Sequence, residues 1–186
     1  MTREWDDILC LQAITTGCIV LEPLTVAHAE AMFQVLADPL LYRHLDESAP
    51  ASVEELRRIY TARQSRKSPD RKQLWLNWVI RVDGQAPVGY VQATVTGPGV
   101  AWVAFVVASR HWGRGLGFRA SNAMLAHLEL VYGVRHCMAT VEIDNQRSIR
   151  LLQRLGFQPA TPSEAGAHAL SETERLFLLT RIDRGG

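Results

Sequence analysis

Three glycines, Gly113, Gly115 and Gly117, stand at alternate positions between an apolar run and a run with helical spacing. The apolar run at 100–108 has the composition of a buried strand, and the following run, 118–133, is typical of an amphipathic helix. Glycine loses more conformational entropy on folding than other residues. Three glycines so close together therefore indicate a tight turn, or a place where a ligand approaches the backbone closely. The order of strand, glycine turn and helix leaves free backbone N–H groups at the helix N-terminus, which predicts a binding site for a phosphate or pyrophosphate.

Positive charge supports the same prediction, because three arginines flank the turn: Arg110, Arg114 and Arg119. The P-loop pattern is absent, since no lysine followed by serine or threonine closes the turn. The dinucleotide-binding pattern is incomplete, since Phe118 occupies the place of its third glycine. A module that binds NAD or ATP through this loop is therefore kept as the alternative.

The rest of the chain predicts a mixed sheet. Antiparallel hairpins come first, with a turn signal at Asp83-Gly84, and a β-α-β-α-β order follows. Residues 1–16 fit a short helix or an extra edge strand, and 160–170 reads as a loop. The predicted strands are 17–24, 74–82, 87–95, 101–108, 137–143 and 175–182, and the predicted helices are 25–37, 52–68, 115–132 and 145–157.

Composition narrows the class of protein. The 186 residues fit one domain, and a net charge of +1 argues against nucleic acid or a membrane surface as a partner. The three cysteines, Cys10, Cys18 and Cys137, lack metal-ligand spacing and are expected to be buried or half-buried thiols. The acidic start of the chain lacks the basic region of a signal peptide, so we expect a cytoplasmic protein.

Two motifs carry a resemblance to a known family. "WGRGLG" (112–117) resembles the coenzyme A pyrophosphate loop of the Gcn5-related N-acetyltransferases (GNAT), with Trp112 at its first position. "NQRSIRLLQRLGF" (145–157) resembles the second coenzyme-contacting helix of that family. The order and spacing also match, and the Trp-Gly-basic-Gly form is similar to the ribosomal-protein N-terminal acetyltransferase (RimJ/RimL-like) branch.

The resemblance implies a fold and a domain organisation. The fold is α/β (mixed α+β): a mostly antiparallel sheet that splays between two parallel strands, 101–108 and 137–143, with helices on both faces. One N-acetyltransferase domain spans 17–184 after an N-terminal extension, 1–16. A monomer or a homodimer is expected.

The resemblance also implies acetyl-coenzyme A as the cosubstrate, with no metal. The pantetheine arm would lie along the first splayed strand, the pyrophosphate on the glycine loop, and the second helix beside them. The implied coenzyme-binding residues are Phe105, Val106, Val107, Trp112, Gly113, Arg114, Gly115, Leu116, Gly117, Asn145, Ser148 and Leu151.

The implied reaction is direct attack of a primary amine on the thioester in a ternary complex. Glu142, at a strand end beside the cleft, is the candidate base through a water molecule, or else a solvated strand-end acid. Many relatives place a tyrosine acid one position after Leu151, where this chain has Leu152. Ser148 is the replacement candidate for the acid, or else a helix hydroxyl bonded to its own backbone.

The sequence leaves more than one class of acceptor amine open. His44 and Asp46, with Glu47, lie where relatives place a substrate-side loop, and they could bind an amine or be ordinary loop residues. A protein or peptide α-amine is the first expectation, a small-molecule amine is the second, and a coenzyme-binding regulator without turnover is a further alternative.

Overall fold

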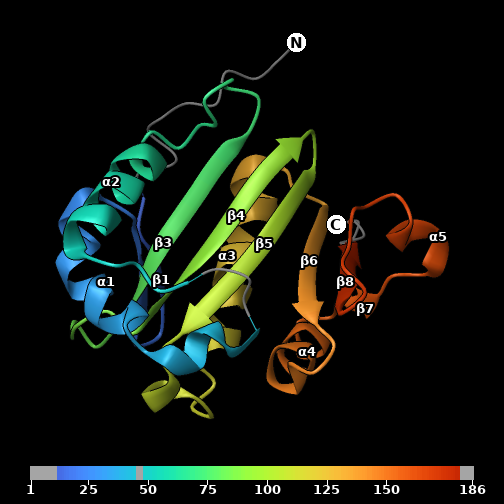
Figure 1. Ribbon diagram of the computed structural model, residues 1–186. Helices are drawn as coiled ribbons and strands as arrows, with labels where there is room; N and C mark the ends of the chain where they lie inside the picture. Colours follow the sequence, from blue (N-terminus) through green and yellow to red (C-terminus); the bar gives the residue numbers. More distant parts are fainter. Residues whose placement is uncertain (1–11, 45–47, 181–186) are drawn as a thin grey trace.

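The computed structural model describes residues 12–44 and 48–180, which build one eight-stranded sheet in the order β1-β2-β3-β4-β5-β6-β8-β7 (Figure 1). Every neighbouring pair is antiparallel except β5 and β6, which are parallel. The strands are β1 (Ile14–Thr16), β2 (Ile19–Pro23), β3 (Leu74–Val82), β4 (Gly89–Gly97), β5 (Val100–Val107), β6 (His136–Glu142), β7 (Gln158–Pro159) and β8 (Glu174–Thr180).

Helices cover both faces of the sheet, as the resemblance implied. Figure 1 shows α3 behind the strands, and α1 and α2 in front of the β3 side. No helix in the described part of the chain is long and apolar enough to cross a membrane. The helices are α1 (Ala29–Leu36), α2 (Val53–Gln64), α3 (Leu116–Tyr132), α4 (Gln146–Arg154) and α5 (Pro162–Ala165), and the 3₁₀ turns are η2 (Val26–His28), η3 (Pro39–His44) and η4 (Ser109–His111).

The period-two pattern of β3 explains the two layers. Leu76, Trp78 and Ile80 point into the core cluster that α3 covers, as their spacing predicts. Val79 points the opposite way, into a smaller cluster that includes Met32 from α1 together with residues of α2. The sheet is therefore buried on both faces at β3, which fixes the positions of α1 and α2.

The parallel pair β5–β6 separates after three paired positions: Val100 with His136, Ala101 with Cys137 and Trp102 with Met138. Both strands then continue, to Val107 and Glu142, without pairing to each other. This confirms the predicted splay and leaves one backbone edge of β5 open.

Several details differ from the sequence prediction. The helix expected to reach residue 68 ends at Gln64, because Arg66 adopts a left-handed φ of 60° that a helix cannot continue through. The expected loop 160–170 contains α5, which Thr161 caps by accepting a hydrogen bond from the Glu164 amide. The two-residue strand β7 was also missed.

Two further differences concern the N-terminal part. Residues Ile14–Thr16 form an edge strand, which is one of the two alternatives for residues 1–16. Cys18 is exposed rather than buried, because it lies at the turn between β1 and β2, whereas Cys137 is buried as expected. Cys10 lies outside the described residues.

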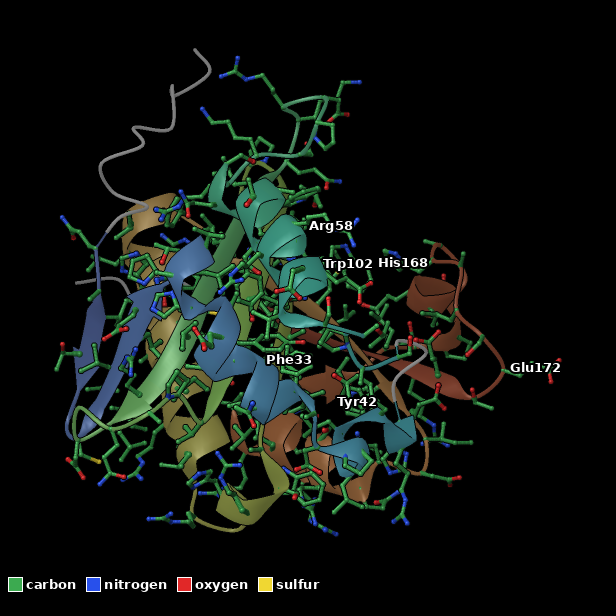
Figure 2. The ribbon with its side chains drawn as sticks, turned by 60° about the vertical axis from the view of Figure 1, so that its left-hand side comes forward. Phe33, Tyr42, Arg58, Trp102, His168 and Glu172 are labelled. Atoms are coloured by element: carbon green, nitrogen blue, oxygen red, sulfur yellow. The ribbon has the colours of Figure 1, made fainter. Side chains whose placement is uncertain are left out.

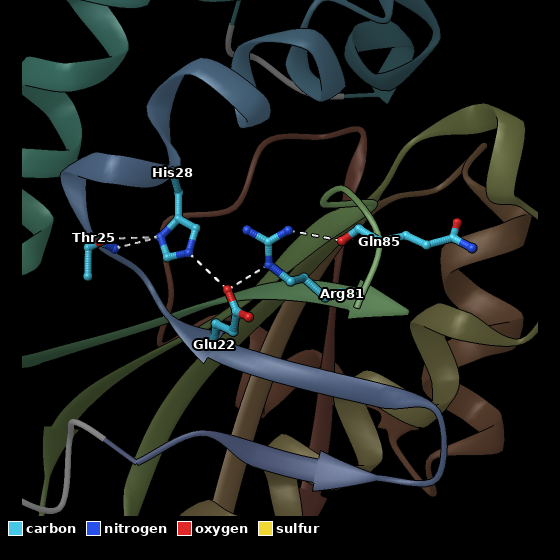
Figure 3. A network of polar contacts seen from close by, with 5 residues as sticks. All are labelled: Glu22, Thr25, His28, Arg81 and Gln85. Carbon is cyan, nitrogen blue, oxygen red and sulfur yellow. Dashed lines mark hydrogen bonds and ion pairs between the residues drawn. The ribbon is translucent and has the colours of Figure 1, made fainter. Parts of the chain in front are cut away.

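A polar network joins β2, η2 and β3 (Figure 3). Arg81 donates from Nε to Glu22 Oε2 at 2.7 Å and from Nη1 to the Gln85 carbonyl at 2.9 Å. His28 Nδ1 accepts from the Thr25 amide at 3.0 Å, so its Nε2 carries the proton and donates to the same Glu22 oxygen at 3.1 Å. The network fixes the start of α1 against the sheet.

We expect this network to make stability depend on acid pH. Burial raises the pKa of Glu22, but the hydrogen bonds from Arg81 and His28 and the charge of Arg81 outweigh burial and hold the pKa below its ordinary value. The resulting stability is present above the unfolded pKa of about 4.3 and is lost as the pH falls through the lower folded pKa. Glu22→Gln should therefore lower the free energy of unfolding at pH 7 by about 0.5–1 kcal/mol, since the carboxylate is partly exposed.

Urea unfolding at pH 7, 5 and 3 measures this effect. The difference between Glu22→Gln and the unsubstituted chain should shrink toward pH 3. Glu30→Gln is the control. Glu30 is exposed, and its carboxylate forms a long surface ion pair of 3.9 Å with the Arg57 guanidinium. Equal pH profiles for the two variants would contradict the expectation.

Candidate functional site

A cleft of about 670 Å³ opens where β5 and β6 separate. Its walls are the end of β5, the glycine loop with the start of α3, one face of α4 along its whole length, and η3. Every predicted coenzyme-binding residue lines it except Arg114, whose Nη1 instead lies 3.1 Å from His111 Nδ1. The structure thus brings together two motifs that lie about 30 residues apart in the sequence.

The glycine loop is shaped as an anion cradle. Gly113 and Gly115 have φ values of 75° and 72°, in the left-handed region, and open space lies where a side chain would project. No side chain caps the N-terminus of α3, and its first turn carries no acidic residue. The free N–H groups and the positive end of the helix dipole therefore face the cleft.

Gly117 has a different role. A Cβ atom added there would lie 3.0 Å from Leu151 Cδ1 and 3.6 Å from Val107 Cγ2. The absence of a side chain lets the start of α3 pack closely against α4 and β5. Gly117 thus determines how closely α3, α4 and β5 approach one another beside the cleft.

Trp112 joins the two walls of the cleft. Its Nε1 donates to the Val107 carbonyl at 2.6 Å, and the Arg147 guanidinium carbon lies 3.6 Å from the ring centroid. A second cation–π pair lies about two turns further along α4, where the Arg154 guanidinium carbon is 4.6 Å from the centroid of the Phe118 ring, at the start of α3. These contacts hold α4 against the glycine loop.

The open edge of β5 offers backbone groups to a ligand. Along a strand, the N–H and C=O groups of one residue point to the same side, and the side alternates from residue to residue. The Ala108 amide donates to Val88 on the β4 side, whereas the Val107 carbonyl is turned to Trp112. The backbone groups of Phe105 and Val107 therefore face the gap between the strands, and an extended amide chain can pair there.

The charge of the cleft suits a polyphosphate. Four arginines and one carboxylate, Asp144, are among the described residues that line the cleft. The arginines are Arg43, Arg147, Arg150 and Arg154. Burial and the charges of Arg110 and Arg114 lower the pKa of His111, which keeps its ring neutral at pH 7. No group of three or more potential metal ligands occurs among the residues that the structure describes.

Ser148 lies in the cleft wall at the start of α4. Asn145 caps this helix, since its Oδ1 accepts from the Ser148 amide at 3.1 Å. Within the described ranges, the Ser148 hydroxyl has no hydrogen-bond acceptor of its own, so it is available to a ligand. Leu152 is in the core and 1% exposed, so no group at that position faces the cleft.

The remaining predicted residues are distributed differently. Glu142, expected beside the cleft, is not one of its lining residues, and it stands directly opposite Glu174 in the β6–β8 pairing. His44 lies on the cleft wall. Asp46 and Glu47 lie outside the described residues.

Asp38 connects the start of η3 to η4, the turn that leads into the glycine loop. Its Oδ2 accepts from the Ser109 amide at 2.8 Å, and its Oδ1 accepts from the Leu40 amide at 3.0 Å. Hydrogen bonding to Ser109 holds the pKa of Asp38 below its ordinary value despite partial desolvation. The carboxylate therefore stays ionised and fixes the start of η4.

A second cavity of about 120 Å³, called here the side pocket, adjoins the cleft, and Leu41 and Val106 line both. It lies between the sheet, α2 and η3, and Figure 2 shows Tyr42 on η3. The sequence analysis did not identify it. Its polar and ionisable lining residues are Tyr42, Ser48, Glu55, Tyr60, Arg63, Asn77 and Tyr90.

Comparison with known proteins identifies the family. The sequence model for the acetyltransferase (GNAT) domain matches residues 19–158, which is most of the chain. A search of curated protein sequences found no significant match.

Solved structures share the fold at low sequence identity. Ribosomal L7/L12 alpha-N-protein acetyltransferase RimL, in complex with coenzyme A, has a TM-score of 0.76 and 16% identity over 91% of this chain and 98% of that chain. The microcin C7 self-immunity acetyltransferase MccE, with acetyl-CoA and AMP, has a TM-score of 0.73 and 12% identity over 89% and 94%. A putative GNAT-family acetyltransferase from Bordetella pertussis has a TM-score of 0.69 and 24% identity over 91% and 99%.

These findings decide between the alternatives left open for the glycine loop, in favour of coenzyme A over NAD or ATP. The residues described above fit that cosubstrate: a loop for the pyrophosphate, basic side chains around it and an open strand edge. The chain therefore belongs to the GNAT acetyltransferase family and is an N-acetyltransferase.

Proposed function

We propose that the chain transfers the acetyl group of acetyl-coenzyme A directly to the α-amine of a peptide or protein. The observation that carries this proposal is the junction of the cleft and the side pocket at Val106 and Leu41. A coenzyme lying along the open edge of β5 would bring its thioester to this junction, where an amine from the side pocket can reach the carbonyl carbon.

The chemistry favours an α-amine over a lysine side chain. The amine must be neutral to attack, and an α-amine with a pKa near 8 is about one-tenth neutral at pH 7, whereas a lysine amine with a pKa near 10.4 is almost fully protonated. Asp144 is the only carboxylate among the described residues that line the cleft. An acceptor that needs little deprotonation therefore suits this site, and a small-molecule amine of low pKa is the second candidate.

The proposed reaction passes through a tetrahedral intermediate. The amine nitrogen bonds to the thioester carbon, the carbonyl oxygen gains negative charge, and a backbone N–H on the open β5 edge stabilises it. The tetrahedral intermediate then releases the coenzyme thiolate and the amine loses its proton. Ser148 is proposed to relay a proton from water to the thiolate, so that its own hydroxyl is restored, and Glu142 to receive the amine proton through another water molecule.

Binding and turnover test the proposal separately. Acetyl-coenzyme A at a hundredfold its dissociation constant should raise the melting temperature by about 5–10 °C, and NAD or ATP should not. Mass spectrometry of a peptide pool after reaction should then show acetylated N-termini. Labelling of lysines alone would overturn the α-amine acceptor, and binding without turnover on any amine would support a non-catalytic regulator.

The role of Ser148 predicts a specific kinetic change. Ser148→Ala should lower kcat about 10- to 100-fold and leave the affinity for acetyl-coenzyme A within about twofold, because the lost group acts on the leaving thiolate. Ser163→Ala, on the exposed α5, is the matched control. An unchanged kcat would leave Ser148 with a structural role only.

Glu142 can be tested against its own neighbour. If Glu142 receives the proton, Glu142→Gln should lower kcat by about 100-fold and flatten the rise of kcat/KM with pH. Glu174→Gln is the matched control, because Glu174 stands opposite on β8 and carries the same charge. Identical pH profiles for the two variants would exclude Glu142 as the base.

A further inference from the structure

The walls of the side pocket are mainly apolar and phenolic. Leu24 and Leu56 are almost fully buried in the cluster beneath α1 and α2, and Tyr60, from the next turn of α2, is 2% exposed. Burial raises the pKa of Tyr60, so its phenol stays neutral at any physiological pH. The Tyr42 hydroxyl donates to the Leu36 carbonyl at 2.8 Å, which turns its polar end toward the backbone.

The charge in the side pocket is balanced. Its lining residues include one carboxylate, Glu55, and one guanidinium, Arg63. Glu55 Oε2 accepts from the Ala51 amide at 2.6 Å, so part of its charge is already satisfied by the backbone. Because the described residues of the adjoining cleft are strongly basic, a polycation would meet net repulsion from them at this junction.

The position of the side pocket relates it to the acceptor. Val106 and Leu41 line both cavities, and Val106 is on β5, so a group seated in the side pocket lies next to the strand that has the open backbone edge. A cavity of about 120 Å³ holds one aliphatic side chain or a single ring rather than a long chain.

From these observations we infer that the acceptor is a monoamine with an aliphatic or aromatic group on the carbon next to the nitrogen, and that the side pocket binds this group. The inference rests on the proposed function, and it names the substrate class of the same site. Both an N-terminal residue with an apolar side chain and a free amine of the same shape carry this chemistry. Polyamines and aminoglycosides do not.

A panel of amines tests the inference. Initial rates would be measured for glycinamide, leucinamide, tyrosinamide, a leucine-led tripeptide and spermidine at saturating acetyl-coenzyme A. We expect kcat/KM for the leucine and tyrosine compounds to exceed that for glycinamide by at least about 10-fold, with spermidine below glycinamide. A rate for the tripeptide above that for leucinamide would identify a peptide as the source of the amine. A rate for leucinamide above that for the tripeptide would identify a free amine.

A substitution that partly fills the side pocket provides the second measurement. Ile59→Trp places a large ring at the exposed edge of the side pocket, because Ile59 lines it and is 36% exposed. It should lower kcat/KM for leucinamide at least about 10-fold, with the value for glycinamide and the affinity for acetyl-coenzyme A unchanged. Leu130→Trp is the control, since Leu130 is an exposed aliphatic residue on α3 and lines neither cavity.

The outcomes separate the two proposals. If glycinamide or spermidine reacts as well as leucinamide, acetyl transfer stands and the inference about the side pocket is overturned. Equal effects of Ile59→Trp on leucinamide and glycinamide overturn it as well. If acetyl-coenzyme A binds and no amine of the panel reacts, the proposed function fails, and the inference fails with it.

Discussion

Gly115→Glu should weaken the binding of acetyl-coenzyme A at least ~100-fold. Gly115 is the N-cap of α3, with a φ of 72°, and nothing lies within 4 Å of the place where its side chain would begin. A carboxylate there would occupy the cradle proposed for the pyrophosphate. Two like charges about 4 Å apart near a protein surface repel by about 4 kcal/mol, and every 1.4 kcal/mol is a tenfold change in affinity.

Two controls separate charge from backbone strain. Gly115→Gln introduces the same strain and nearly the same volume without the charge, and should cost much less affinity. Gly84→Glu places the same carboxylate at a glycine with a φ of 69° in the β3–β4 turn, away from the cleft, and should leave affinity unchanged. Isothermal titration calorimetry measures all three. Equal losses for the Glu and Gln variants at position 115 would mean that no phosphate sits at this loop.

The coenzyme side of the site was predictable because its signals are local. A left-handed turn requires glycine, so Gly113 and Gly115 are visible in the sequence as a conformational requirement. The start of α4 is equally local, because the Asn145 cap and the amide it accepts lie three residues apart. Splaying of β5 from β6 followed from the resemblance, and the sheet pairing confirms it.

The side pocket was not predictable because it is assembled from distant segments. Tyr60 lies one helix turn after Leu56, so in the sequence it belongs to the apolar stripe of α2 and gives no sign of lining a cavity. Tyr90 comes from β4 and Tyr42 from η3, and only the packing of α2 and η3 over the sheet places the three phenols around one cavity.

The same reason applies to the contact between Trp112 and Arg147. In the sequence, Trp112 stands at the first position of the glycine motif, and its stacking on a residue of α4 depends on how close α3 comes to α4. That distance depends in turn on Gly117, whose missing side chain makes room for Leu151. The motif therefore specifies the turn, whereas the width of the cleft is a property of the packed structure.

Gly89→Ala should destabilise the protein by about 3 kcal/mol and lower its melting temperature by about 6–12 °C. A Cβ atom at Gly89 would lie 2.0 Å from the Val106 carbonyl oxygen and 2.9 Å from Val107 Cα. These are backbone atoms, so no side-chain rotation can relieve the overlap, and β4 and β5 would have to move apart. Gly89 pairs directly with Val107, so the displaced part of β5 is the part that lines the coenzyme cleft.

Gly97→Ala is the matched control on the same strand, because nothing lies within 4 Å of a Cβ atom at Gly97. It should change stability by no more than about 0.5 kcal/mol and leave coenzyme binding intact. Thermal unfolding with and without acetyl-coenzyme A measures both effects, and Gly89→Ala should also show a smaller stabilisation by the ligand. Equal melting temperatures for the two variants would contradict the close approach of β4 to β5. A stability loss with an unchanged ligand shift would mean that the end of β5 does not contact the coenzyme.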